Sequence, residues 1–237
     1  MKTSLTIVRY PAWAIPFAFL GMAWMRIPLY LNKKISFFKL MGSGKNGTFD
    51  KTPDLRQWAI LCVADERNFN GMETTNEAVY GKSIARWLKW FGCEIYSLAL
   101  DPVEGHGLWD GQQPFGDLKK KADHDGLIAV LTRATIRFSR LSYFWKHVAP
   151  VAAQMSKAEG FITSVGIGEI PWIKQATFSI WESREAMKAF AYKNREHAEV
   201  IKKTREQRWY SEDMFIRFRI THCTGTLRGS NPLEGKL

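Results

Sequence analysis

Hydrophobic and polar positions alternate in some stretches of the chain and recur every three or four residues in others. Alternation predicts strands, and the longer spacing predicts helices with one apolar face. In the first half the predicted elements are, in order, strand 4–10, helix 12–31, strand 35–42, strand 57–64, helix 77–91 and strand 94–100. In the second half they are strand 127–137, helix 141–157, strand 161–167, strand 174–181, helix 184–208 and strand 214–221. Both halves therefore follow the order strand-helix-strand-strand-helix-strand.

The two halves also share a local sequence feature. FFKLMGSG at 37–44 resembles FITSVGIG at 161–168, so that a Gly-x-Gly turn follows the second strand of each half. Glycine at such a turn permits a positive φ or a bulge. A strand rather than a helix comes next, which argues against a phosphate-binding loop.

This element order is that of a ferredoxin-like βαββαβ unit, in which two helices cover one face of a four-stranded antiparallel sheet. Two such units bury their remaining faces by packing sheet against sheet. The predicted fold is therefore α+β, a dimeric α/β-barrel-type fold with the helices outside. The predicted organisation is a first unit at 1–101, a connector at 102–126, a second unit at 127–223 and a tail at 224–237. We expect the Gly-, Asp- and Lys-rich connector to cross the surface and the tail to be loosely held.

The predicted helix at 184–208 carries a histidine on its apolar face. The residues that share this face, at steps of three and four, are Met187, Phe190, Asn194, His197, Ile201 and Arg205. A neutral imidazole there, opposite a sheet, can ligate an iron porphyrin. A core histidine bonded to a backbone carbonyl is the commoner arrangement at such a spacing. Both interpretations of His197 stay open at this point.

Composition narrows the choice of partners. The 10 Trp and 15 Phe residues supply rigid surface for a large apolar molecule, although most of them belong to the core. A net charge of +11 attracts anionic partners. Zinc-finger spacing, an RNA-binding aromatic signature and a basic helix with heptads are all missing, so we expect no nucleic acid partner. The separated cysteines Cys62, Cys93 and Cys223 indicate free thiols in a reducing, cytoplasmic compartment.

Residues 12–31 are apolar enough to imitate a membrane anchor. Arg26, Pro16 and Pro28 interrupt the stretch, and a strand precedes it. A signal peptide would need a basic end directly before its apolar core. We therefore expect a buried or surface-lying helix, with peripheral membrane contact as the alternative.

Several stretches together resemble one known family. They are LTRATIR at 131–137, FW at 144–145, GIGEIP at 166–171, QATFSIW at 175–181, AF at 189–190, HA at 197–198, FIRFR at 215–219, WDG at 109–111 and PF at 114–115. In this combination the chain resembles the spheroidene monooxygenase family, the acyclic carotenoid ketolases of phototrophic bacteria and their homologues. The resemblance runs along most of the chain and is densest in its second half. The first half departs most from the family pattern, at 12–31 and 65–75.

The resemblance implies a haem b protein that uses dioxygen and external electrons, typically from a ferredoxin. Such an enzyme oxidises a methylene of a long polyene to a ketone in two rounds. The resemblance also implies a haem between the second-half sheet and its helices, because the wider group of such haem proteins, aldoxime dehydratases included, uses a helical histidine as proximal ligand. His197 matches that position, and imidazole ligation leaves one coordination position open for dioxygen. Phe190, Ile201, Phe178 and Trp172 are the further cofactor-binding candidates, with core packing as the alternative.

Two arginines are the catalytic candidates. Arg133 and Arg137 share one face of the predicted strand at 127–137. A guanidinium there can pair with a haem propionate or orient bound oxygen. It can equally form a structural ion pair with Glu169 or Glu182.

Other interpretations stay open for the site and the function. His147 is a second ligand candidate, whereas His106 and His124 lie in the polar connector. The alternatives to a monooxygenase are another haem enzyme on the same fold, similar to an aldoxime dehydratase or a peroxidase, and a cofactor-free binding module. Homo-oligomers are common on this fold, but no interface can be read from the sequence.

Overall fold

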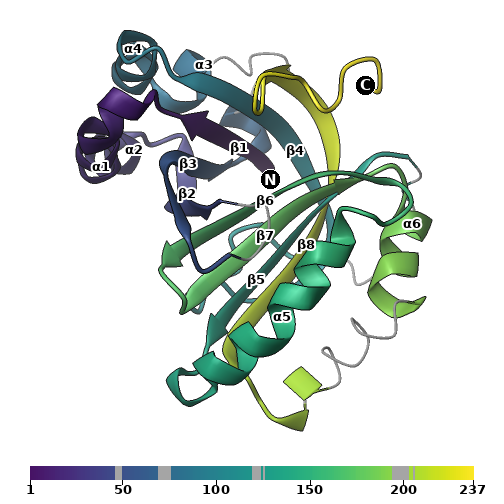
Figure 1. Cartoon of the computed structure of the whole chain (residues 1–237). Helices are drawn as coiled ribbons and strands as arrows, with labels where there is room; N and C mark the ends of the chain where they lie inside the picture. The colour runs from purple at the N-terminus through teal and green to yellow at the C-terminus, as the bar shows by residue number, and fades with distance from the viewer. Residues whose placement is uncertain (46–49, 69–75, 119–123, 125, 194–202, 205) are drawn as a thin grey trace.

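Eight antiparallel strands of the described residues close into one barrel, in the order β1-β3-β2-β6-β7-β5-β8-β4 (Figure 1). The structure is a computed structural model that describes residues 1–45, 50–68, 76–118, 124, 126–193, 203–204 and 206–237. The strands are β1 Lys2–Arg9, β2 Ile35–Gly44, β3 Pro53–Ala64, β4 Glu94–Gly107, β5 Ile128–Ile136, β6 Phe161–Ile170, β7 Lys174–Trp181 and β8 Tyr210–Gly225. The helices are α1 Ile15–Trp24, α2 Arg26–Leu31, α3 Asn76–Tyr80, α4 Lys82–Trp90, α5 Leu141–Met155 and α6 Arg184–Lys188. The predicted α+β barrel with external helices is confirmed.

Each half of the chain contributes one continuous part of the barrel wall. The first half supplies the neighbours β4-β1-β3-β2, and the second supplies β8-β5-β7-β6. The two parts meet along a long β4–β8 ladder, which runs from Tyr96 opposite Gly225 to Gly107 opposite Met214. On the other side β2 and β6 pair only through Gly42 with Gly168 and Ser43 with Ile167. The barrel therefore has one extensive seam and one short seam.

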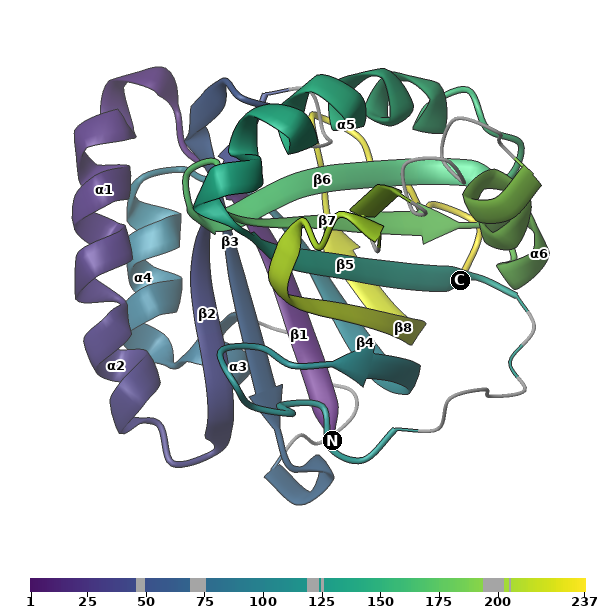
Figure 2. The same ribbon diagram turned by 90° about the horizontal axis from the view of Figure 1, so that it is seen from below.

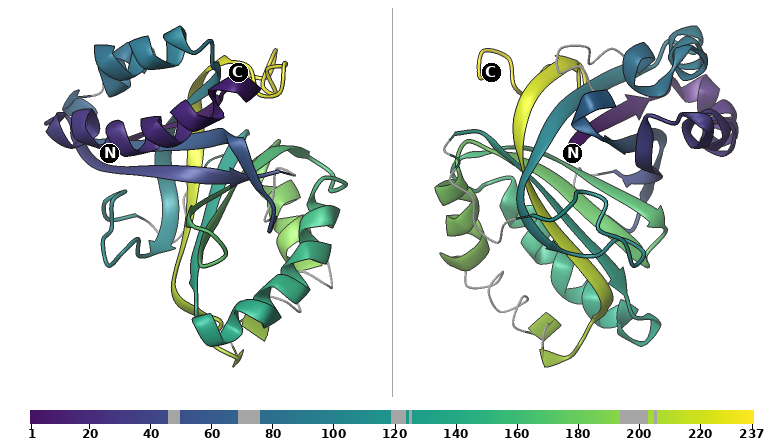
Figure 3. Two further views of the ribbon diagram at one scale, coloured as in Figure 1. Left: turned by 60° about the vertical axis from the view of Figure 1, so that its left-hand side comes forward. Right: turned by 180° about the vertical axis from the view of Figure 1, so that it is seen from behind.

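The helices form two layers on opposite sides of the strands, α1–α4 outside the first-half sheet and α5–α6 outside the second (Figures 2 and 3). Local sequence sets where several helices start and stop. Gly81, with φ of 89°, separates α3 from α4 within the helix predicted at 77–91. The Ser183 hydroxyl accepts a hydrogen bond from the Ala186 amide at 3.1 Å and caps α6.

The barrel interior is packed with apolar side chains rather than hollow. Leu5, Leu61, Leu98 and Leu131 are each at most 1% exposed and belong to one cluster that fills it. Alternation along each strand directs these residues inward and their neighbours toward the helices. Protein side chains therefore occupy the described interior, which favours the helix-covered outer faces as the site for a large ligand.

The connector and the tail both contribute to that interior, contrary to the expectation of a surface crossing and a loose tail. Trp109 and Phe115 of the connector and Leu227 and Leu233 of the tail are buried in the barrel cluster. The sequence signal is weak because each is a single apolar residue in a stretch without periodicity. Gly107 is essential to the path of the connector, since a Cβ there would lie 2.2 Å from the Asp213 carbonyl oxygen.

Candidate active site between the second sheet and its helices

The outer face of the second-half sheet carries two separate apolar clusters. One, here called the α6 cluster, contains Ile128, Val130, Met155, Trp181 and Met187, with Phe190 and Phe215 packed against it. The other, the α5 cluster, contains Ile136, Phe144, Trp145 and Trp209. Ile128 and Ile136 stand at opposite ends of β5. The clusters therefore leave the middle of the sheet between them.

The outward side chains of β5, β6 and β7 in that middle region are small. Gly166 of β6 pairs with Thr177 of β7, Thr177 pairs with Thr132 of β5, and Thr132 pairs with Phe215 of β8. Alternation places these residues on the helix side, because their neighbours lie in the barrel cluster. We call the small outward residues the floor; they are Thr132, Ala134, Ser164, Gly166, Thr177 and Ser179. The floor is a flat surface of short side chains on adjacent strands.

The floor differs from an ordinary core in the exposure of one residue and the hydrogen bonding of another. Thr132 is exposed although it lies on a strand with neighbours on both sides. Thr177 is only 7% exposed, yet its hydroxyl has no hydrogen-bond partner within the part of the chain that the structure describes. An orphaned buried hydroxyl costs about 1–3 kcal/mol. The other floor residues are buried, and the Ser179 hydroxyl accepts a hydrogen bond from the Trp181 indole at 2.9 Å. The exposed Thr132 and the unbonded Thr177 hydroxyl are therefore the floor positions open to a further contact.

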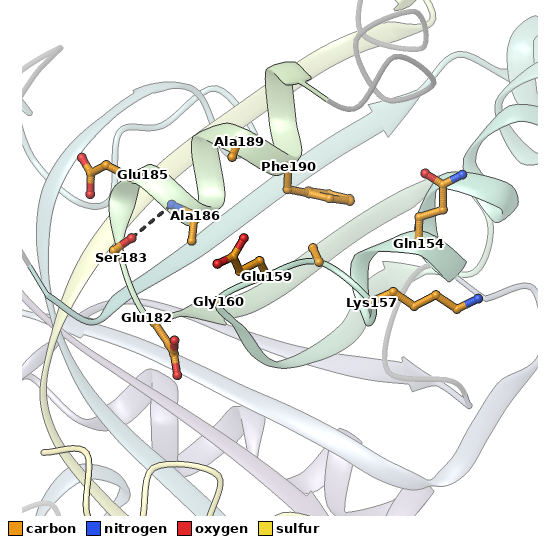
Figure 4. Close-up of a pocket in the computed structure, with 11 residues that line it drawn as sticks. Gln154, Lys157, Glu159, Gly160, Glu182, Ser183, Glu185, Ala186, Ala189 and Phe190 are labelled. Atoms are coloured by element: carbon orange, nitrogen blue, oxygen red, sulfur yellow. Dashed lines mark hydrogen bonds between the residues drawn. The ribbon is translucent and has the colours of Figure 1, made fainter.

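A pocket of about 720 Å³ opens beside the α6 cluster, between the end of α5 and the start of α6 (Figure 4). Phe190 lines it, and its ring lies 5.3 Å from that of Trp181 in the cluster. Glu159, Glu185 and Lys157 also line it, together with Glu182, which pairs with Lys236 at 2.7 Å. The Phe190 ring is the apolar part of the lining that an apolar molecule can contact.

The predicted haem ligand His197 and the further candidate Ile201 lie outside the described residues. The described chain leads to them through a π-helical turn, Ala189–Lys193, that follows α6; such turns are frequent at functional sites. His147 of α5 interacts through Nδ1 with the Tyr143 carbonyl oxygen at 2.8 Å, and its ring lies 5.5 Å from Trp209 of the α5 cluster.

Three further predicted residues lie away from the floor. Phe178 is 3% exposed and points into the barrel, on the opposite side of β7 from Thr177 and Ser179. Trp172 lies in the β6–β7 turn with φ of 65°, 54% exposed, and its indole donates to the Lys51 carbonyl oxygen. Arg137 lies beyond the end of β5, exposed, and donates to the Tyr210 carbonyl oxygen. This placement corrects the expectation that these side chains gather around one helix-side site.

Arg133 also points into the barrel, where it is 1% exposed and surrounded by carboxylates. It pairs with Glu212, with Asp110 at 3.0 Å and with Glu169 at 3.5 Å. Of its two predicted roles, the ion pair with Glu169 is the one the structure shows. The guanidinium is on the far side of the sheet from the floor.

Lysines complete this interior network. Lys174 pairs with Asp110 at 2.6 Å, and Lys39 pairs with Asp110 and with Glu169. Burial opposes ionisation of Asp110, but the hydrogen bonds from Lys174 and Lys39 outweigh it and lower its pKa to about 2. Asp110 is therefore ionised at neutral pH. The Trp109 indole joins the same network by donating to Glu169 at 2.8 Å.

The floor itself was not anticipated from the sequence. Its signal is the alternation of small residues in Ser164-x-Gly166-x-Gly168 and Thr177-x-Ser179. In an ordinary covered sheet these outward positions hold larger apolar side chains. Only the structure shows that the two stretches lie side by side.

Comparison with known proteins gives a sequence relationship and a fold relationship. No protein-family model matches the chain. The chain is 31% identical over 238 residues to a spheroidene monooxygenase of Rhodobacter capsulatus, covering 99% of this chain and 96% of that protein. It is 31% identical over 209 residues to a spheroidene monooxygenase of Cereibacter sphaeroides, covering 88% of this chain and 63% of that longer relative.

Solved structures with the same fold have little sequence in common with the chain. An aldoxime dehydratase superposes with a TM-score of 0.63 at 9% identity, covering 98% of this chain and 86% of that one. An aldoxime dehydratase in complex with butyraldoxime superposes with a TM-score of 0.60 at 9% identity, covering 92% and 79%. At such identity the likeness concerns the fold alone.

Proposed function

The chain belongs to the spheroidene monooxygenase family, and from that premise we propose that it is a cytoplasmic haem-dependent monooxygenase acting on a long apolar, carotenoid-like substrate. The observation that carries the proposal is the floor of short side chains between the α6 and α5 clusters, with Thr132 exposed and the Thr177 hydroxyl unbonded among the described residues. The finer description of the barrel as two ferredoxin-like units, 1–101 and 127–223, belongs to the same proposal. The equivalent strand orders β4-β1-β3-β2 and β8-β5-β7-β6 support it.

The residues of the floor fit a porphyrin by shape and polarity. Short side chains leave room for a flat macrocycle, and the apolar clusters at both ends of the floor suit its hydrocarbon edges. The Thr177 hydroxyl offers a donor that has no partner in the described protein. His197 is the proposed proximal ligand, and Phe190 lies seven residues before it on the same face of the predicted helix.

When bound, an imidazole-ligated haem supplies a site for dioxygen and accepts electrons one at a time. Each round of the proposed reaction takes one dioxygen, two electrons and two protons, inserts one oxygen atom into a C–H bond and releases one water. A second round on the same carbon gives a geminal diol, which loses water to form the ketone. The floor and its clusters would orient the polyene and exclude water.

The electrons must come from a separate protein. A ferredoxin-type donor is acidic, and the net charge of +11 favours its approach. A homo-oligomer of the chain would be detected by measuring its mass in solution.

The test is the visible absorption spectrum of the purified protein before and after addition of haem and then dithionite. We expect an intense Soret band that sharpens on reduction, because a histidine-ligated iron changes its spin and charge state. His197→Ala is expected to abolish the band while the far-UV circular dichroism is retained. The matched control is His147→Ala, which should keep the band.

Two outcomes contradict the proposal. A colourless protein that does not respond to haem removes the haem chemistry and leaves a binding module. A band lost in His147→Ala but retained in His197→Ala moves the ligand to α5. If haem is bound, oxygen uptake with a polyene and reduced ferredoxin then distinguishes a monooxygenase from another haem enzyme.

A further inference from the structure

The helix layer of the first half exposes unusually large apolar side chains. On α1, α2, α4 and the turn before α1 the exposed ones are Trp13, Phe17, Phe19, Leu20, Ile27, Tyr30, Leu31 and Trp90. Tyr30 and Trp90 are 81% and 84% exposed. Monomeric proteins rarely present so many large apolar residues together without a partner.

These residues belong to adjacent helices. The rings of Trp24 and Trp87 stack at 5.2 Å, and those of Phe17 and Phe91 stack at 4.9 Å, which holds α1 beside α4. Figure 2 shows α1 and α2 at the outer edge of the molecule, with α4 next to them. We call this outward surface the α1–α2 face.

On α1 the small side chains face the protein and the large apolar ones face outward, which is the reverse of an ordinary surface helix. Its inward residues are small, Ala18 and Gly21, and a Cβ at Gly21 would lie 3.0 Å from the Trp87 indole nitrogen. Its outward residues include Phe17 and Leu20. Close packing on the protein therefore uses the small side chains, and the large apolar ones are left for an external contact.

Cations predominate on this surface. Residues 1–49 contain no Asp or Glu, and neither does α4. Exposed cations border the apolar residues; they are Arg26, Lys33, Lys34, Lys82, Arg86 and Lys89, of which Lys82 pairs with Glu77 of α3 at 3.9 Å. Apolar and aromatic side chains bordered mainly by cations are the combination that binds an anionic lipid surface.

We propose that the α1–α2 face docks on the surface of an anionic lipid bilayer. The stretch Ala12–Leu31 is long and apolar enough to cross a membrane. It lies on the surface instead, because Ala14, Ala18, Met25 and Leu29 are buried against the first-half sheet. Docking brings the protein to the phase in which a long apolar substrate dissolves, and it does not depend on the proposed haem.

The experiment is co-sedimentation of the full chain with vesicles of phosphatidylcholine alone or with a third of phosphatidylglycerol. We expect binding to the anionic vesicles that weakens with salt, and little binding to the neutral ones. Arg26→Glu/Lys33→Glu/Lys34→Glu should lower partitioning by about fivefold or more for each cation lost. Ile27→Ser/Tyr30→Ser/Trp90→Ser should lower it at least about tenfold through loss of apolar contact.

Because all three apolar positions are at least 61% exposed, the second variant should fold normally. The matched control is Phe138→Ser, which removes an 84% exposed aromatic residue outside this face. Wild-type protein that ignores both vesicle types overturns the proposal. So does a dimer in solution that Ile27→Ser/Tyr30→Ser/Trp90→Ser dissociates without change in vesicle binding, since the face would then contact a second copy. Vesicle binding is read without turnover, so its failure and that of haem binding are distinguishable.

Discussion

The outer faces of both sheets carry small polar residues, but the side chains that contact these residues differ between the two halves. The first-half sheet also carries small polar residues facing its helices, namely Ser4, Thr6 and Ser97. There the Tyr80 phenol fills the space, lying 3.0 Å from the Ser4 hydroxyl and donating to Thr6 at 2.6 Å. In the second half Thr132 is exposed and the Thr177 hydroxyl is unbonded among the described residues. One sheet is completed by its own tyrosine, and the other keeps an exposed threonine and an unbonded hydroxyl, where we propose that the ligand binds.

The chemistry of Tyr80 suits that structural role. It is 1% exposed, and burial raises the pKa of its phenol, so the group stays neutral. Thr6 in turn lies 2.8 Å from the Ser97 hydroxyl. The first-half network is therefore closed, with no polar group directed at solvent.

The largest expected effect comes from removing the Tyr80 side chain that fills the space outside the first-half sheet. Tyr80→Ala should lower the free energy of unfolding by about 3–5 kcal/mol, because it creates a cavity and leaves Ser4 and Thr6 without their partner. Urea denaturation measures it. Tyr80→Phe keeps the volume and should cost about 1–3 kcal/mol. Equal losses in the two variants would show that ring volume contributes nothing, contrary to the comparison.

An intermediate effect is expected from placing a large side chain on the floor of the second-half sheet. Thr132→Phe places a ring on the floor and should weaken haem retention by about tenfold or more, since overpacking costs about 1–3 kcal/mol. Haem titration followed at the Soret band measures it. Ser139→Phe, at an exposed position beyond the same strand, is the control. Unchanged haem affinity in Thr132→Phe would exclude the floor as the binding surface.

The smallest effect is expected from removing a hydroxyl that has no partner. Thr177→Val should change the free energy of unfolding of the haem-free protein by less than about 1 kcal/mol, in either direction, because no hydrogen bond is lost. The same change at Thr6 breaks bonds to Tyr80 and Ser97 and should cost more. A larger loss at Thr177 than at Thr6 would reverse the proposed difference between the sheets.

Periodicity was enough to predict the barrel, and it was not enough to predict the site. The strand predicted at 174–181 matches β7, and the predicted order of elements in both halves is observed. The role of Arg133 could not be decided, because strand alternation shows that two residues share a face but not which face is interior. Glu212, Asp110 and Glu169 come from three distant parts of the chain, and their meeting at Arg133 depends on barrel closure.

The burial of single apolar residues in the connector and the tail could not be predicted from the sequence either, because it also depends on the tertiary fold. Trp109 and Leu233 are buried by the tertiary path of segments that carry no repeating pattern. Conversely, the exposed apolar residues of α1 satisfy the same hydropathy pattern as a core helix. Hydropathy measures how strongly a side chain avoids water, and does not say whether protein or lipid will shield it.

The short seam between β2 and β6 has an evolutionary consequence. Only Gly42 with Gly168 and Ser43 with Ile167 pair there, and the Ser43 hydroxyl donates to the Gly166 carbonyl oxygen at 2.8 Å. Few substitutions on one side of this seam need a matching substitution on the other. Coupling between the halves therefore depends mainly on the β4–β8 ladder and the shared barrel interior, and homologues should diverge more in the outer helix layers than along that ladder.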